Sequence, residues 1–209
     1  MHLELILSFL ATSIILSLMP GPDNIYVLTE SITKGYKNGI SISFGLGLGV
    51  LVHTTAAATG LSLIIMKSAM VFTIIKYLGA AYMFYLAYKS IGEKRVKIDI
   101  ENEKEDASLS VLQLVRKGFL MNILNPKVSL FFIAFLPQFV SSDGYNITIQ
   151  MIILGVIFMI QAIIIFSAIA ILSSRLTKYV NDSKFWNITK WSKVGVLSIL
   201  GLSLILSDR

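Results

Sequence analysis

The chain contains no cysteine, which excludes disulfide bonds, iron–sulfur ligation and thiolate zinc sites. Charged residues are also scarce, at 14% of the chain against about 25% in a typical soluble domain. Histidine occurs only twice, and the sequence shows no His-Glu-x-x-His motif, no nucleophile elbow and no Walker loop. The sequence therefore predicts neither an enzyme nor an ATP-driven protein, and no cofactor or metal site.

Hydrophobic residues make up 55% of the chain, and they gather in long runs. About 20 consecutive apolar residues in a helix cross the hydrocarbon core of a bilayer. We therefore predict an all-α, polytopic membrane protein with six transmembrane helices in the lipid bilayer. The six predicted spans are residues 3–29, 40–66, 69–87, 118–140, 147–172 and 191–206.

Two polar segments that contain proline interrupt the first and the fourth of these runs. They are Pro20-Gly21-Pro22-Asp23-Asn24 and Asn125-Pro126-Lys127. A broken helix inside lipid frees backbone groups, so it persists mainly where it lines a cavity or lies buried in protein. A matched pair of such breaks indicates the binding site of a transporter.

The positions of the two breaks suggest an internal repeat. A shift of 106 residues places Pro20 on Pro126, and each half of the chain then holds three spans. Since three is odd, the second half enters the membrane upside down relative to the first. We predict two inverted three-helix repeats, residues 1–92 and 114–209, joined by a charged cytoplasmic loop, residues 93–113, within one membrane domain. Sites in this architecture lie near the bilayer midplane between the halves.

The distribution of lysine and arginine predicts the orientation of the spans. Two basic residues follow the first span, seven lie in or beside the long third loop, and five follow the fifth span. Thus 14 of the 18 basic residues lie on one side. Because cytoplasmic loops carry the excess of basic residues, both termini are predicted to face outward. The same pattern argues against nucleic acid as a partner.

Asp23 and Lys127 are the charged candidates for a site beside the breaks. An ionisable side chain inside a span is costly, and it is by default a functional candidate. Once the halves are superposed the two residues nearly coincide. We therefore predict that they meet, either paired or flanking one cavity, and bind the two ends of a zwitterion. Two other interpretations stay open: Asp23 caps the following helix at the membrane surface, or the charges form a structural ion pair.

Proline and amide side chains complete the predicted site. Each proline removes a backbone donor, whereas Gly21 lets a backbone or ligand approach closely. A helix that begins at such a break directs free N–H groups and a positive dipole end toward the cavity, which suits a carboxylate. Simple kinks without a ligand are the alternative. The remaining candidates at the breaks are Pro20, Pro22, Asn24, Asn122, Asn125 and Pro126.

His53 is a further candidate, within the second span. At 100° per residue it shares a stripe of small residues with Gly45, Gly49, Ala56 and Gly60. Small residues let helices pack closely, so we predict that His53 faces protein rather than lipid. His53 then either binds substrate or titrates, or it is a packed histidine with its hydrogen bonds satisfied.

Two segments carry a resemblance to a known family. The motif at residues 20–24 and the segments 118–127 and 135–139 are similar to the signatures of the LysE/RhtB family of bacterial amino-acid exporters. The length and the glycine-rich second span also fit. The resemblance implies a small secondary carrier of the bacterial cytoplasmic membrane. It implies functional roles for Asp23, Asn125, Pro126 and Lys127.

The resemblance implies that the protein expels an amino acid or a close derivative, with the proton gradient or the membrane potential as energy source. Which amino acid is exported is not encoded in these motifs, and whether the chain forms a homodimer is left open. Related families export metal ions, so a cation exporter with Asp23 and His53 as ligands is the alternative, although two such groups make a poor metal site. A structural subunit is a third interpretation, which the charges inside the spans argue against.

Overall fold

The computed structural model describes residues 2–61, 69–93, 109–141, 144–180 and 182–206, and every regular element in these ranges is helical. The predicted all-α fold is therefore confirmed. The elements are α1 (Leu3–Leu18), α2 (Pro22–Lys34), α3 (Tyr36–Ala56), the π-helical turn η1 (Ala57–Leu61), α5 (Ala69–Ile91), α6 (Val111–Ile123), α7 (Pro126–Leu130), the π-helical turn η3 (Phe131–Phe135), the 3₁₀ turn η4 (Leu136–Phe139), α8 (Ile147–Val180) and α9 (Ser183–Leu206).

The described helices include four that are long and apolar enough to cross a membrane, and two bent pairs that qualify when each pair is taken as one span. The first pair, α1 with α2, bends by 57°, and the second, α6 with the segment from Pro126 to Phe139, bends by 51°. Six spans with breaks in the first and the fourth were predicted, and the bent pairs lie at those two positions.

Proline begins the second part of each broken span. Pro22 is the first residue of α2 and Pro126 is the first residue of α7. The N–H of a first helical residue has no partner within the helix, so proline costs no hydrogen bond at this position. Aligning these two prolines shifts the match between the halves from 106 to 104 residues. Asp23 and Lys127 then occupy the same position, the second residue of a helix, so the two breaks carry opposite charges at equivalent points.

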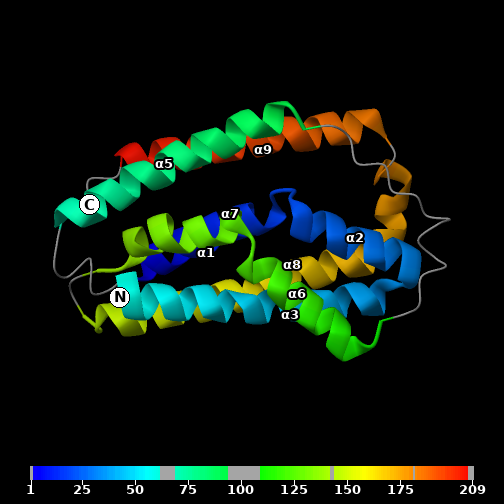
Figure 1. Ribbon diagram of the computed structural model, residues 1–209, viewed down its shortest axis with the longest axis horizontal. Coiled ribbons are helices and arrows are strands. Elements are labelled where there is room, and N and C mark those ends of the chain that lie inside the picture. Colours follow the sequence, from blue (N-terminus) through cyan, green and yellow to red (C-terminus); the bar gives the residue numbers. More distant parts are fainter. Residues whose placement is uncertain (1, 62–68, 94–108, 142–143, 181, 207–209) are drawn as a thin grey trace.

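The helices form two layers around the broken spans. α5 lies side by side with α9, while α3 packs against α6 and α8, and α8 also contacts α1 and α2 (Figure 1). α3 contacts α8 and α5 contacts α9, which are the second and third spans of each predicted three-helix half. The start of α1 and the end of α9 lie at the same end of the molecule, as an even number of spans requires (Figure 1).

Glycine allows α3 and α6 to approach at backbone distance. A Cβ atom built on Gly45 would lie 2.0 Å from the carbonyl oxygen of Val115, and one on Gly118 would lie 2.3 Å from that of Ile42. The predicted small-residue interface is therefore confirmed for this part of α3. Ala56 and Gly60, further along the same stripe, are exposed.

The last predicted span begins earlier than expected. α9 starts at Ser183 instead of residue 191, so Lys190, which precedes the predicted span, lies on the helix. Most of the predicted cytoplasmic loop 93–113, residues 94–108, lies outside the described residues. Its last residues belong to α6, which begins at Val111 behind a capping box made by Ser110 and Gln113.

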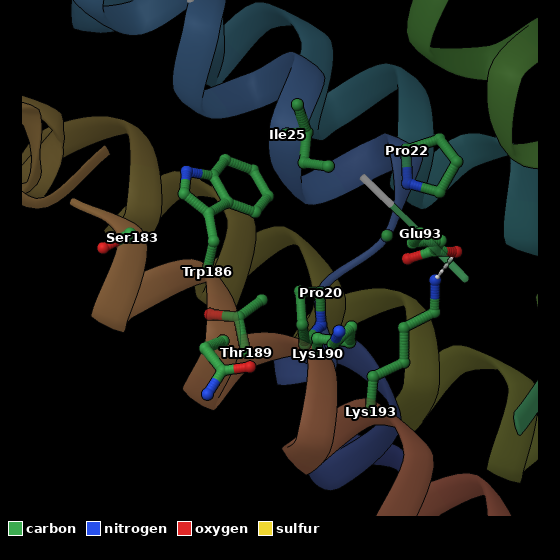
Figure 2. Close-up of a pocket in the computed structure, with 11 residues that line it drawn as sticks. Pro20, Pro22, Ile25, Glu93, Ser183, Trp186, Thr189, Lys190 and Lys193 are labelled. Atoms are coloured by element: carbon green, nitrogen blue, oxygen red, sulfur yellow. Dashed lines mark hydrogen bonds and ion pairs between the residues drawn. The ribbon is translucent and has the colours of Figure 1, made fainter. Parts of the chain in front are cut away.

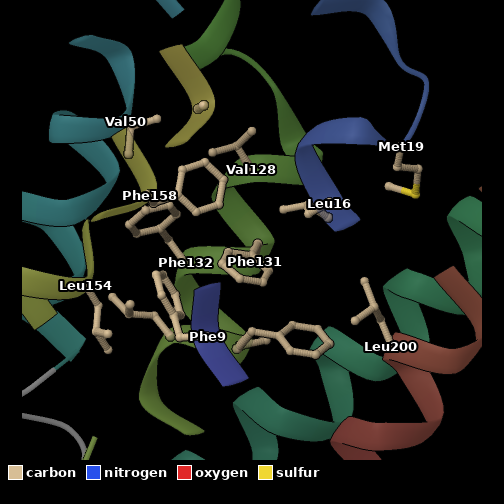
Figure 3. Close-up of a cluster of buried hydrophobic side chains, with 14 of the residues drawn as sticks. Phe9, Leu16, Met19, Val50, Val128, Phe131, Phe132, Leu154, Phe158 and Leu200 are labelled. Carbon is tan, nitrogen blue, oxygen red and sulfur yellow. The ribbon is translucent and has the colours of Figure 1, made fainter. Parts of the chain in front are cut away.

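An aromatic cluster fills the core between the breaks and the end of the molecule that holds the termini. Phe9 of α1 contacts Phe131, with ring centroids 5.9 Å apart, and Phe158 of α8 lies 5.2 Å from Phe132 (Figure 3). Phe9, Phe131 and Phe132 are almost completely buried. These rings pack against one another on that side of the breaks.

Candidate functional site

The two breaks meet at a hydrogen bond between side chains 102 residues apart. Asn125 Nδ2 donates to Asp23 Oδ2 over 2.7 Å, and only 2% of Asp23 and 6% of Asn125 are exposed. Asn125 also caps α7, because its Oδ1 accepts from the backbone N–H of Lys127. The amide of Asn125 therefore holds the second break in shape and binds the carboxylate of the first.

The side chain of Lys127 extends from α7 to the end of α1. Its buried ammonium group donates to the carbonyl oxygens of Leu16 and Met19, each at 3.2 Å. The last carbonyls of a helix lack partners within the helix and carry the negative end of its dipole. Lys127 thus stabilises the end that the break creates in α1, and this position gives its buried charge a partner.

Asp23 and Lys127 flank one small cavity and form no direct ion pair with each other. Of the two arrangements predicted from the sequence, the structure thus has the second. The cavity has a volume of about 10 Å³, which is room for roughly one water molecule. An amino acid does not fit, so this conformation is closed around the site. The cavity is lined by Leu16, Ser17, Asp23, Asn122, Lys127, Val128, Phe158 and Phe166.

Amide side chains leave unpaired acceptors around Ser17, one of the residues that line this cavity. Asn24 donates to the carbonyl oxygen of Ser17 over 2.8 Å, and Gln161 donates to its hydroxyl over 2.9 Å. The amide oxygens of Asn24, Asn122 and Gln161 are buried without a hydrogen-bond partner. Buried acceptors almost always find donors, so these three oxygens suit a ligand that brings N–H groups.

His53 and Gly21 do not line the cavity, but each lies close to a residue that does. The Nε2 atom of His53 is 3.1 Å from the carbonyl oxygen of Asn122, and the half-buried ring does not line the cavity. His53 thus faces protein, as predicted. A Cβ atom on Gly21 would meet Lys127 Nζ at 3.5 Å, an ordinary contact distance, so the fold alone does not require glycine there.

Sequence reasoning missed the contribution of α1. Ser17 and the carbonyl oxygens of Leu16 and Met19 supply polar contacts to side chains from the other half of the chain. The spacing of Ser13 and Ser17, four residues apart in an apolar helix, was the signal available, because it puts two hydroxyl groups on one face. Backbone carbonyl groups that lack a partner at a helix end cannot be identified from residue types in the sequence.

The fold and this site define a class of protein: a multi-pass, helical membrane protein whose broken spans bring buried charges together, as in secondary transporters. The chain belongs to the LysE type translocator family, whose pattern matches residues 14–208. The resemblance found in the motifs is thereby confirmed. The family consists of transporters and not of enzymes, as the sequence predicted.

Three relatives illustrate the similarity along the chain. An uncharacterized membrane protein of Bacillus subtilis, YrhP, is 31% identical over 205 residues, which cover 95% of this chain and 96% of the relative. An uncharacterized membrane protein of Vibrio cholerae is 27% identical over 99% of this chain and 98% of its own length. The homoserine/homoserine lactone efflux protein of Salmonella typhimurium is 29% identical over 85% of this chain and 84% of its own length. No solved structure matches the chain.

Proposed function

We propose that this protein exports an amino acid or a close derivative across the bacterial cytoplasmic membrane by secondary active transport. The observation that carries the proposal is the set of groups at the breaks. The carboxylate of Asp23, the ammonium group of Lys127 and the amide of Asn122, whose oxygen is unpaired, line one cavity. The side chains of Asn24 and Gln161, with two further unpaired amide oxygens, bind Ser17 in the lining of that cavity. The ammonium group of the substrate is expected at Asp23 and the amide oxygens, and its carboxylate at Lys127. The efflux protein of Salmonella typhimurium supports the choice of substrate class.

The same geometry offers a route for coupling to protons. Asp23 is the carboxylate that lines the cavity. When Asp23 binds a proton it loses its negative charge, and its attraction for the substrate ammonium group is weakened. Competition between the two makes proton binding favour substrate release. A proton that arrives from outside therefore replaces the substrate that leaves, and export becomes coupled to proton entry.

Metal export, the alternative from the sequence, is less well supported. Lys127 places a buried positive charge at the cavity, and this charge repels a metal ion bound at Asp23. In the described ranges no group of three or more His, Cys, Asp or Glu side chains could hold a metal ion. Asp23 and His53 do not line the cavity together, so they form no pair of ligands there.

Loading cells with dipeptides tests the proposed function. Hydrolysis of the dipeptides raises the internal amino-acid pools, and we expect cells that make this protein to release one or a few of these amino acids faster than cells without it. Release should depend on the proton gradient or the membrane potential. Equal release from both kinds of cell for every amino acid contradicts the proposal, and a changed tolerance to divalent metals supports the alternative.

The predicted orientation, with both termini outside, rests on the distribution of basic residues and can be tested separately. Cysteines are placed at Lys37, beside the turn between α2 and α3, and at Tyr145, which is 66% exposed in the connection before α8. The native chain has no cysteine to interfere. With an impermeant thiol reagent outside intact cells, we expect labelling at position 145 and none at 37. The reverse pattern inverts the predicted orientation of the termini.

A further inference from the structure

A second, larger cavity lies on the other side of the first break. Its volume is about 400 Å³, within the range of small-molecule sites. The turn Pro20-Gly21-Pro22 forms one wall, the first half of α9 forms another, and Glu93 follows the end of α5 (Figure 2). Gly21 lines this cavity and also lies beside the ammonium group of Lys127. The turn therefore separates this cavity from the closed site.

Charged side chains of α9 face into this cavity. Lys190 and Lys193 both line it, and Lys193 forms an ion pair with Glu93 (Figure 2). Lys193 stands ten residues after the start of α9, about 15 Å along the helix axis. Charges at such positions in a span face protein or a water-filled cavity and mark substrate pathways. Glu93 is half exposed, so the ion pair is in contact with solvent.

Two further features suit a small ligand with an apolar part. Trp186 and Ile25 provide apolar surface on opposite walls, one from α9 and one from α2 (Figure 2). Two lysines against one glutamate leave a net positive charge in the cavity, which favours a ligand that carries a carboxylate. A zwitterion carries one negative and one positive charge. Its carboxylate can therefore pair with Lys193 and its ammonium group with Glu93, so that neither side chain is left without an opposite charge when their ion pair opens.

We propose that this cavity is a loading site, which binds the free carboxylate of an amino acid before the substrate passes the Pro20-Gly21-Pro22 turn. Lys193 releases Glu93 and binds the carboxylate together with Lys190, Glu93 binds the ammonium group, and the side chain lies against Trp186 and Ile25. The proposal rests on the proposed export function. It adds a requirement for a free carboxylate, so amides of the same amino acids should load poorly.

Thiol protection tests binding independently of transport. A cysteine is placed at Thr189, which lines the cavity, and another at Lys184, which is exposed on α9 outside it. The variants are reconstituted in phosphatidylcholine vesicles and treated with a water-soluble thiol reagent. Threonine, homoserine, leucine and aspartate are tested, each as the free acid and as its amide. We expect at least one free acid to slow labelling at position 189 severalfold and its amide not to, with no protection at 184.

Transport kinetics test the assigned charges. Lys190→Gln and Lys193→Gln should each raise the half-saturating substrate concentration about tenfold, since a hydrogen bond to a charged group contributes that much, and change the maximal rate little. Lys184→Gln is the matched control and should behave as the native protein. Exchanging the charges, as Glu93→Lys with Lys193→Glu, restores an ion pair but should not restore the affinity for substrate.

The outcomes separate the two proposals. Protection at position 189 without export of any amino acid contradicts the export function and leaves the loading site in place. Export without protection by any free acid overturns the loading site alone. The loading site is also overturned if an amino acid and its amide protect position 189 equally. It is overturned if free acids protect this position only in vesicles that contain anionic phospholipid. Full recovery of the substrate affinity by the charge exchange overturns it as well. The last of these results would make the Glu93–Lys193 pair structural.

Discussion

Replacing Asp23 with asparagine is expected to abolish coupled export while the protein still folds and inserts. Asparagine keeps the size of the side chain and an oxygen that can accept from Asn125, so the contact between the breaks persists. The negative charge for the substrate ammonium group is lost, and with it the competition with a proton. Truncating one partner of a buried charge pair costs about 2–5 kcal/mol, so transport should fall about 30-fold or more.

Initial rates of export from loaded vesicles, with and without an imposed pH gradient, provide the measurement. Glu4→Gln is the matched control, because Glu4 is an exposed carboxylate in the first turn of α1. It should leave export unchanged. A D23N variant that exports at nearly the native rate, with the same dependence on the pH gradient, removes Asp23 from the mechanism.

Replacing Lys127 with methionine is expected to damage both transport and stability. Methionine fills a similar volume, but the carbonyl oxygens of Leu16 and Met19 lose their donor and the charge of Asp23 loses its counter-charge at the cavity. Each buried acceptor left unpaired costs about 1–3 kcal/mol, so the two together should cost roughly 2–6 kcal/mol. Thermal unfolding in detergent measures this effect, and Lys37→Met, at an exposed lysine, is the control.

The double variant shows whether the two charges share one site. Combining Asp23→Asn with Lys127→Met removes both charges, so part of the stability lost in the lysine variant should return. Sites that do not interact give additive changes within about 0.5 kcal/mol. An additive result would mean that Asp23 and Lys127 act independently, which contradicts a shared substrate site.

The breaks themselves were predictable from the sequence. A proline inside an apolar run removes a helical donor wherever the chain folds, and a charge beside it must find a partner, so Pro22 with Asp23 and Pro126 with Lys127 identified the site locally. The predicted shift between the two halves, 106 residues, was two residues too large, because the first break contains two prolines and the wrong one was aligned with Pro126. The structure shows that Pro22, and not Pro20, begins the second helix.

The start of α9 was not predictable in the same way. Lys190 and Lys193 interrupt the apolar pattern, so both were counted with the basic residues that follow the fifth span, and the sixth span was predicted to begin only at residue 191. In the structure the helix continues through both residues, because their side chains face a cavity between α9 and the first break and Lys193 pairs with Glu93, 100 residues earlier. Local hydropathy does not include such distant partners.

The sequence by itself determined the class of fold, the two breaks and the charges beside them, since each follows from the chemistry of a few neighbouring residues in an apolar run. Only the tertiary structure decided what those charges contact. Lys127 binds the end of α1, Asn125 joins the two breaks, and the turn at Gly21 divides a closed site from an open cavity. These contacts depend on how helices from opposite halves pack, and no local pattern records that packing.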